Sequence, residues 1–117
     1  PVAGDRARAN MIIIGTKGGK FDVLAYLRTE CDPIHAVFSS QNPHCILTIE
    51  STPRSEEDHT IDSCVYEFYR NSLQRLSAIS IPMKAAVSCV AWNKQEDKLL
   101  LGCNDKSLVG IIHCSVN

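Results

Sequence analysis

The chain has 117 residues, of which 44% are hydrophobic and 6% aromatic, and its formal net charge at pH 7 is −1. A chain of this length can bury one small core, so we expect one structural unit. Without a basic excess to neutralise phosphates, the composition does not support nucleic-acid binding. The longest apolar runs, such as 11–14 and 99–101, are too short to cross a bilayer, and we expect a soluble segment without membrane insertion.

The chain opens at Pro1 with neither an initiator methionine nor a charged-then-apolar leader, and we expect it to be cut from a longer protein. Six cysteines without a Cys-x-x-Cys pair could form a disulfide framework in a secreted chain. Because most of them lie inside apolar runs, we favour free thiols that pack as small hydrophobic side chains in a reducing compartment. The cysteines are Cys31, Cys45, Cys64, Cys89, Cys103 and Cys114.

Short apolar runs rich in Ile, Val, Leu, Phe and Tyr alternate with turn residues along the whole chain, which is typical of an all-β fold. Residues 1–10 are expected to be an N-terminal linker. Gly18-Gly19 predicts a hairpin turn with positive φ, and residues 51–62 are expected to form a polar, acidic loop. The predicted strands are 11–15, 20–28, 34–38, 45–50, 63–69, 73–81, 87–92, 98–103 and 107–112.

An internal repeat indicates the architecture. The segment 34–38 matches 87–91, and 46–49 matches the segment from Leu99, both at a separation of 53 residues. The segment 12–15 matches 99–102, which places a further step of 34 residues before the middle unit. Steps averaging about 43 residues are typical of four-stranded propeller blades. We therefore predict an incomplete WD-repeat-like β-propeller of about two antiparallel blades over residues 11–117: the tail of one blade, one full blade and most of a third.

The last unit, Val87 to Asn93 followed by Asp97 to Leu108, resembles a WD-repeat blade in its order of strand, turn, apolar strand, glycine and Asp-containing turn. It lacks the Gly-His pair and the Trp-Asp dipeptide of the best repeats. The whole run from Asp5 to Leu108 is similar to the propeller part of the Fritz family of WD-repeat planar cell polarity effectors. The residues that carry this resemblance are Asp5-Arg6-Ala7, Gly15, Leu27-Arg28-Thr29-Glu30, Asp32-Pro33, Asp62 to Glu67, Arg70-Asn71, Ile81-Pro82 and Glu96 to Cys103.

The resemblance implies a non-enzymatic scaffold that acts with Inturned and Fuzzy homologues in planar cell polarity and cilium assembly. It also implies links to septins and to a Rab-type GTPase pathway. The implied location is the cytoplasm, at the ciliary base or basal body and the axoneme, with association with the plasma membrane. The resemblance implies no catalytic residue and no cofactor.

Three chemical motifs are incomplete in this sequence. The run from Gly15 to Lys20 lacks phosphate-loop spacing, because Ile14 stands where the first glycine is needed and Phe21 follows the lysine. The four histidines and six cysteines lack the paired spacing of a zinc site. No local pattern indicates a nucleophile with its base. We therefore expect no catalytic, cofactor or metal site.

Two kinds of candidate site remain. Thr52, which precedes Pro53, and Ser55, which precedes three acids, are candidate phosphorylation sites in a segment otherwise expected to be a solvated loop. Tyr66, Tyr69 and Trp92 are candidate partner contacts, although burial between blades is the stronger expectation for them.

The first functional hypothesis is a protein-interaction module. The alternatives are a fragment of a propeller enzyme of hydrolase type, with its site in the central channel, and a segment of a coat-like or intraflagellar-transport-like structural protein.

Overall fold

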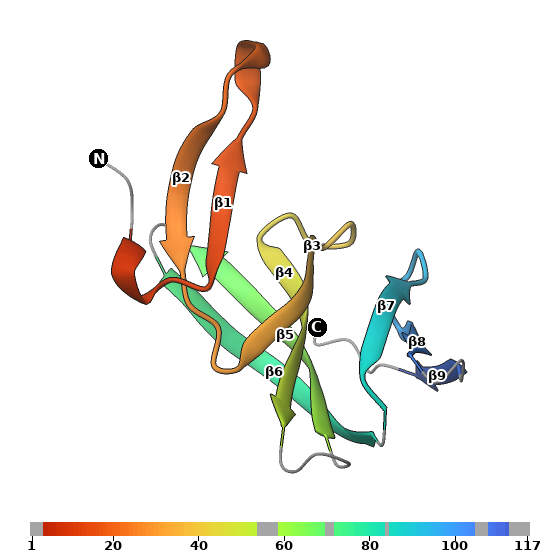
Figure 1. Ribbon diagram of the computed structural model, residues 1–117. Coiled ribbons are helices and arrows are strands. Elements are labelled where there is room, and N and C mark those ends of the chain that lie inside the picture. The colour runs from red at the N-terminus through yellow and green to blue at the C-terminus, as the bar shows by residue number, and fades with distance from the viewer. Residues whose placement is uncertain (1–3, 54–58, 70–71, 84, 105–107, 113–117) are drawn as a thin grey trace.

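Figure 1 shows the computed structural model of the chain, which describes residues 4–53, 59–69, 72–83, 85–104 and 108–112. These residues form nine β-strands in three antiparallel sheets, and their helical elements are two 3₁₀ turns, at Arg6–Arg8 and Lys17–Gly19. No helix in this part of the chain is long and apolar enough to span a membrane. The all-β class is confirmed, because these elements are strands and short 3₁₀ turns. The three sheets stay separate and do not close into a barrel, as expected for part of a propeller.

The sheets contain two, four and three strands, and within each sheet a strand pairs with the next one along the chain. The first sheet is a hairpin that projects from the rest of the molecule, and the third lies on the opposite side of the middle sheet (Figure 1). The strands are β1 (Met11–Gly15) and β2 (Asp22–Leu27), then β3 (Asp32–Phe38), β4 (Cys45–Pro53), β5 (His59–Tyr69) and β6 (Ser72–Met83), then β7 (Val87–Trp92), β8 (Lys98–Cys103) and β9 (Leu108–Ile112).

The turn between β1 and β2 has the conformation expected from its two glycines. Gly18 has φ of 67° and Gly19 has φ of 73°, values that L-residues with a β-carbon rarely adopt. The predicted positive-φ hairpin turn is confirmed. The run from Gly15 to Lys20, which lacks phosphate-loop spacing, is thus the tip of this hairpin.

The acidic loop is shorter than predicted, so the boundaries 51–62 were wrong. β4 continues through Pro53 and β5 begins at His59, with Thr52 opposite Thr60 and Ser51 opposite Ile61. Thr and Ile favour extended backbone, and their pairing extends the ladder beyond Glu50. Residues 54–58, which hold most of the acids, lie outside the described part of the chain.

The strand pairing confirms one step of the repeat and corrects the other. The match at 53 residues relates β3 to β7 and β4 to β8, which are the first and second strands of their sheets. The other match, which equates β1 with β4 and β8, is wrong, because β1 does not occupy the second position of a sheet as they do. Like β5 and β6, β1 and β2 end a sheet and lead by a short link into the first strand of the next sheet. The error arose because β1 contains an apolar run followed by a turn, as β8 does, although the two strands occupy different positions in their sheets.

The residues before β1 are fastened to the hairpin, although we expected a linker there. Asn10 donates its backbone N–H to the Leu27 carbonyl (2.9 Å), and its side-chain Oδ1 accepts from the Thr29 N–H (2.9 Å). A β-carbon at Gly4 would lie 1.9 Å from the Tyr26 carbonyl oxygen, so only glycine allows this close approach.

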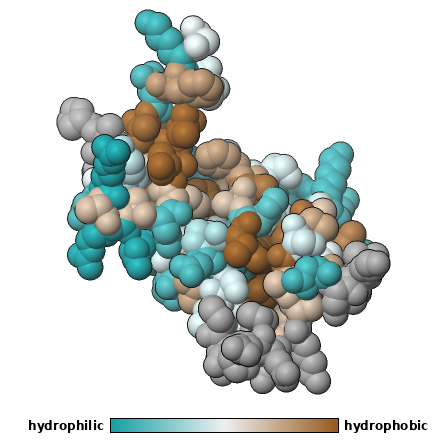
Figure 2. Space-filling view, in the orientation of Figure 1, coloured by the Kyte–Doolittle hydropathy of each residue, from teal (hydrophilic) through white to brown (hydrophobic). Residues whose placement is uncertain are grey.

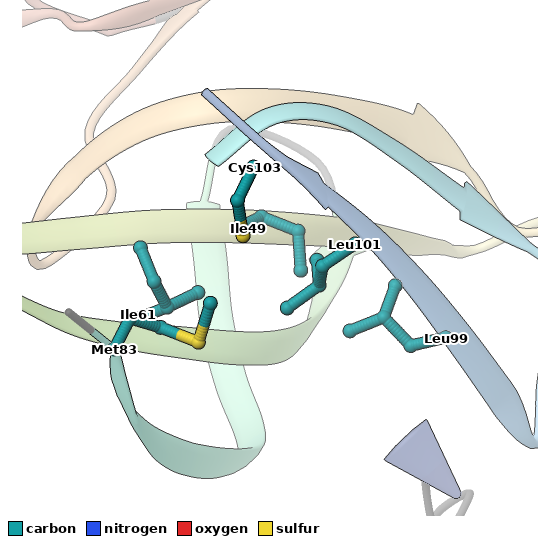
Figure 3. Close-up of a cluster of buried hydrophobic side chains, with 6 residues drawn as sticks. All are labelled: Ile49, Ile61, Met83, Leu99, Leu101 and Cys103. Carbon is teal, nitrogen blue, oxygen red and sulfur yellow. The ribbon is translucent and has the colours of Figure 1, made fainter. Parts of the chain in front are cut away.

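The main core lies between the middle and third sheets. Ile49 of β4, Ile61 of β5 and Met83 of β6 meet Leu99, Leu101 and Cys103 of β8, and Figure 3 shows these side chains converging from the two layers. Alternate residues of a strand point to the same face, which explains why Leu99 and Leu101 are buried while Leu100 between them is half exposed.

The opposite face of the middle sheet packs against the hairpin. Ile46 of β4 contacts Ala25 and Leu27 of β2, with Met11, Ile13, Phe68 and Leu73 around them. The outer face of the hairpin also carries hydrophobic side chains, seen as a brown area in Figure 2. The middle sheet is therefore an interior layer with a neighbour on each face.

Replacing Leu101 with alanine should lower the free energy of unfolding by about 2–5 kcal/mol, because this fully buried side chain fills the space between two sheets. Leu100→Ala is the matched control: Leu100 is 50% exposed on the same strand, and its loss should cost less than about 1 kcal/mol. Urea unfolding of the two variants checks this. Equal losses would contradict the described packing.

Candidate functional site

A buried carboxylate, that of Glu50, organises the polar part of the middle sheet. Its side chain is 0% exposed and accepts three hydrogen bonds: from the Cys31 backbone N–H (2.9 Å), the Thr48 hydroxyl (2.5 Å) and the Tyr66 hydroxyl (3.1 Å). A buried carboxylate needs such donors to offset the loss of water. We call these residues, together with Cys64 and Arg75, the Glu50 network.

The network follows from strand alternation. Thr48 and Glu50 lie two residues apart on one face of β4, and the register places Cys64 and Tyr66 on the same face of β5. Sequence reasoning placed Glu50 at the end of the predicted strand 45–50 and missed this role. The available signal was the spacing Thr48-x-Glu50, which puts two polar residues on the same face of an otherwise apolar strand.

Arg75 of β6 extends the network to its rim. Its Nη2 donates to the Cys64 sulfur (3.2 Å) and lies 3.5 Å from an Asp62 carboxylate oxygen, and its Nη1 pairs with Glu30. Burial, with the Glu50 charge as a second cause, raises the pKa of Cys64 to about 12. The thiol stays protonated at neutral pH, so it is a weak nucleophile.

The network connects the middle sheet to the chain that leaves the hairpin sheet. The Tyr66 hydroxyl also accepts a hydrogen bond from the Glu30 N–H (3.2 Å), and Cys31 donates to Glu50. Both backbone groups belong to the link between β2 and β3. Side chains of the middle sheet therefore hold the chain at the point where it leaves the hairpin sheet.

A second carboxylate joins the middle sheet to the third. Glu96, in the turn between β7 and β8, accepts from the Ser39 hydroxyl (2.5 Å) and from the backbone N–H groups of Ser40 (2.9 Å) and Gln41 (3.2 Å). Glu96 has φ of 60°, unusual for a residue with a side chain. The strained turn aims the carboxylate at the turn after β3. We call this contact the Glu96 clamp.

The three candidate partner aromatics lie in different environments. Tyr66 is 2% exposed and serves the Glu50 network, so the structure removes it as a contact for partners. Tyr69, at the end of β5, is 63% exposed. Trp92 is half-buried, and its ring lies 5.7 Å from that of His35 in the joint between the middle and third sheets. Partner contacts at Tyr69 and Trp92 stay predictions.

The two candidate phosphorylation sites differ in placement. Thr52 is exposed but lies within β4, where it pairs with Thr60. Ser55 lies outside the described residues. Phosphorylation at either position stays a prediction.

Among the described residues, no group of three or more His, Cys, Asp or Glu side chains is placed to hold a metal ion. The cysteines in this part of the chain are free thiols, and Cys45, Cys64 and Cys103 are buried. Cys114 and His113 lie outside it. The buried carboxylates of Glu50 and Glu96 instead lie where one sheet meets the next.

Comparison with known proteins gives a consistent result. Residues 1–113 match the sequence profile of the family described as WD repeat-containing and planar cell polarity effector protein Fritz. The fritz homolog of Homo sapiens is 39% identical over 93% of this chain, and that of Xenopus laevis is 38% identical over the same share. The Drosophila melanogaster protein is 31% identical over 92% of the chain. The chain spans 15% of the length of the first two relatives and 11% of the third.

Successive antiparallel sheets, packed face to face and joined by short links, define a segment of a WD-type β-propeller. The match covers nearly the whole chain, including both strands of the hairpin and both carboxylate joints. The chain belongs to the Fritz family of WD repeat-containing planar cell polarity effector proteins.

Replacing Tyr66 with phenylalanine should lower the free energy of unfolding by about 1–3 kcal/mol, because the change leaves the Glu30 N–H and one Glu50 oxygen without this partner. Tyr26→Phe, at a half-buried tyrosine on β2, should change stability by less than about 0.5 kcal/mol. Thermal or urea unfolding measures both. A Tyr66→Phe variant as stable as Tyr26→Phe would contradict the network.

The raised pKa of Cys64 predicts slow alkylation. At about pH 8, iodoacetamide should modify exposed Cys89 readily and leave Cys64 unmodified until the protein is unfolded, as read by peptide mass spectrometry. The same shift favours the neutral thiol in the folded state. The contribution of this thiol to the free energy of unfolding is therefore fully present below pH 9.0, and it declines as the pH rises from 9.0 toward about 12. Equal labelling of the two thiols in the folded protein would contradict this environment.

Proposed function

We propose that this chain is a propeller segment of a non-enzymatic scaffold that holds Inturned and Fuzzy homologues during planar cell polarity signalling and cilium assembly. The observation that carries the proposal is the identity of 31–39% over more than nine-tenths of the chain to proteins named as planar cell polarity effectors. Because the chain spans a small part of those relatives, the proposal concerns the whole protein to which the segment belongs.

The chemistry of the described residues supports a scaffold. The names of the relatives contain no enzymatic activity. Glu50 and Glu96 accept hydrogen bonds from groups of the chain itself, and the Cys64 thiol is kept protonated. Polar side chains that could otherwise act on a substrate are thus occupied in joining sheets. A rigid propeller is suited to presenting its loops and edges to other proteins.

We extend the proposal to further partners and to location. Septins and a Rab-type GTPase pathway are the additional partners, and the protein acts in the cytoplasm at the ciliary base or basal body, on the axoneme and near the plasma membrane. Membership of the family is what motivates these assignments. In this chain the exposed Tyr69, at the end of a long strand, is the described aromatic that we assign to partner binding, because exposed aromatic rings contribute strongly to interfaces.

Phosphorylation of Thr52 or Ser55 would regulate a second surface, at the opposite end of β5 from Tyr69, by adding a charge of about −1.5 to −2 to a segment already rich in acids. The added charge would repel acidic partners and attract basic ones. Phosphopeptide mapping of the native protein should find at least one of the two residues modified. If both are unmodified in ciliated and dividing cells, this part of the proposal is wrong.

The proposal predicts the outcome of affinity capture from ciliated cells. Tagged full-length protein should recover the Inturned and Fuzzy homologues, and a version lacking residues 5–108 should lose them. Tyr69→Ala should reduce recovery about tenfold, as expected for an aromatic residue at the centre of an interface. Lys20→Ala, at an exposed residue beside the turn of the hairpin between β1 and β2, is the control and should leave recovery unchanged.

The variants separate two failures. If the wild-type protein recovers neither homologue, the scaffold proposal is wrong. If the deletion loses both but Tyr69→Ala retains them, the scaffold stands and the contact lies elsewhere on the propeller.

A further inference from the structure

The connection between β1 and β2 is longer than strand pairing requires. The last pair of this hairpin is Gly15 with Asp22, so the six residues 16–21 form the connection. By their links to the following sheets, β1 and β2 correspond to β5 and β6, and only residues 70 and 71 separate those two strands along the chain. Two residues are enough to join antiparallel strands. The extra length of the first connection is therefore available for another role.

We call residues 16–21 the hairpin tip, and this segment stands clear of the sheets. A β-carbon at Gly18 or Gly19 would meet no atom of the described residues within 4 Å. Figure 1 shows the tip projecting away from the middle and third sheets and apart from the end of β5. The tip is a formed turn, because the Lys20 N–H donates to the Lys17 carbonyl (3.3 Å). A formed turn loses less conformational freedom on binding than a flexible loop does.

The hairpin tip presents one large hydrophobic side chain and two positive charges to solvent. Phe21 is 82% exposed, more than any other large hydrophobic residue that the structure describes. It lies beyond the last pair of the β1–β2 ladder, so it belongs neither to a sheet face nor to a strand edge. Lys17 and Lys20 are exposed and form no ion pair with the described part of the chain. An aromatic ring beside such charges is suited to anchoring a protein interface.

We propose that the hairpin tip inserts into a partner protein, with Phe21 in an apolar pocket and Lys17 and Lys20 against Asp or Glu side chains at the rim of that pocket. Charge complementarity determines the rim, because the tip contains two lysines and no acid. Burial of the ring supplies most of the affinity, and the lysines orient the tip as it approaches. The tip stands apart from the end of β5, where Tyr69 lies, so we assign it a partner other than the Inturned and Fuzzy homologues (Figure 1).

A protein pocket fits the hairpin tip better than an anionic membrane does. Segments that bind anionic lipids carry clusters of about four to eight basic residues, whereas the tip has two lysines. Asp22 directly follows Phe21 and is exposed, so an anionic surface would repel it. A single aromatic ring with two lysines also falls short of the two signals that stable membrane anchoring needs.

The first test is site-specific photo-cross-linking of the full-length protein in a lysate of ciliated cells. p-Benzoylphenylalanine replaces Phe21 in one variant and the exposed Gln95 of the turn between β7 and β8 in the control. Cross-linked peptides are then mapped by mass spectrometry. The Phe21 variant should cross-link to one protein, at an apolar pocket bordered by Asp or Glu side chains. The Gln95 control should give no cross-link to that pocket.

Binding assays with the cross-linked protein separate the two kinds of contact. Phe21→Ala should weaken binding at least about tenfold at low and at high salt, as expected for an aromatic anchor. Lys17→Glu combined with Lys20→Glu should weaken it by a similar factor at low salt and much less at high salt, because salt screens exposed charges. Replacing the rim carboxylates of the partner with lysines should restore binding of this double variant. Gln95→Ala is the control and should bind as the wild type does.

Four results would overturn the proposal. A cross-link only within the same polypeptide, or to a second copy in a mixture of isotopically light and heavy protein, would show that the protein itself covers the tip. A cross-linked surface without acidic residues, or charge reversal that restores no binding, would remove the assigned partner chemistry. Flotation with vesicles of phosphatidylcholine and phosphatidylserine that is lost in Phe21→Ala would identify a membrane instead. Absence of any cross-link, in a variant that melts at the wild-type temperature, would show that the tip binds nothing.

This inference does not rest on the scaffold proposal, and the two can fail separately. Phe21→Ala should leave recovery of the Inturned and Fuzzy homologues unchanged in affinity capture, as Lys20→Ala should. If Phe21→Ala loses either homologue, the tip belongs to the scaffold interface, and the assignment of a separate partner is wrong. If the wild-type protein recovers neither homologue but Phe21 cross-links to an acidic-rimmed pocket, the scaffold proposal fails and the role of the tip stands.

Discussion

Strand β4 is covered on both faces, and the arrangement of the other strands depends on this constraint. Every residue from Cys45 to Glu50 is buried. Leu47 and Ile49 face the third sheet, while Ile46 faces the hairpin, so the middle sheet requires an apolar neighbour on each side. An antiparallel sheet with both faces buried is an interior layer and cannot be stable in isolation. The face-to-face stacking of the three sheets follows from this one requirement.

Apolar contact alone does not determine how stacked sheets are oriented, because it is not directional. The two carboxylates supply the direction. Glu50 holds the backbone between the first and middle sheets, and Glu96 holds the turn between β3 and β4 from the third sheet. Each is placed where the chain passes from one layer to its neighbour. The hydrogen bonds of these two carboxylates are directional, so they fix how neighbouring layers are oriented.

The sequence predicted the fold class and the strands 11–15, 87–92 and 98–103 at their observed bounds, because alternation and turn residues are local signals. It also predicted the positive-φ turn at Gly18 and Gly19. It did not predict the length of the ladder beyond Glu50, since Thr and Pro in an acidic segment resemble a loop. The Glu50 network escaped notice because its members are spread between residues 31 and 75, and only the pairing of β4, β5 and β6 brings them together.

The same reasoning explains why the first sheet differs from the other two. Both faces of the hairpin are hydrophobic: Ala25 and Leu27 pack inward, whereas Ile12 and Leu24 are exposed on the outside. In the middle sheet the same two-sided pattern is satisfied by neighbours on both faces. The pattern of the hairpin therefore resembles that of an interior layer. A propeller whose layers depend on one another in this way is a rigid unit, which favours partner binding at loops and edges over binding by deformation.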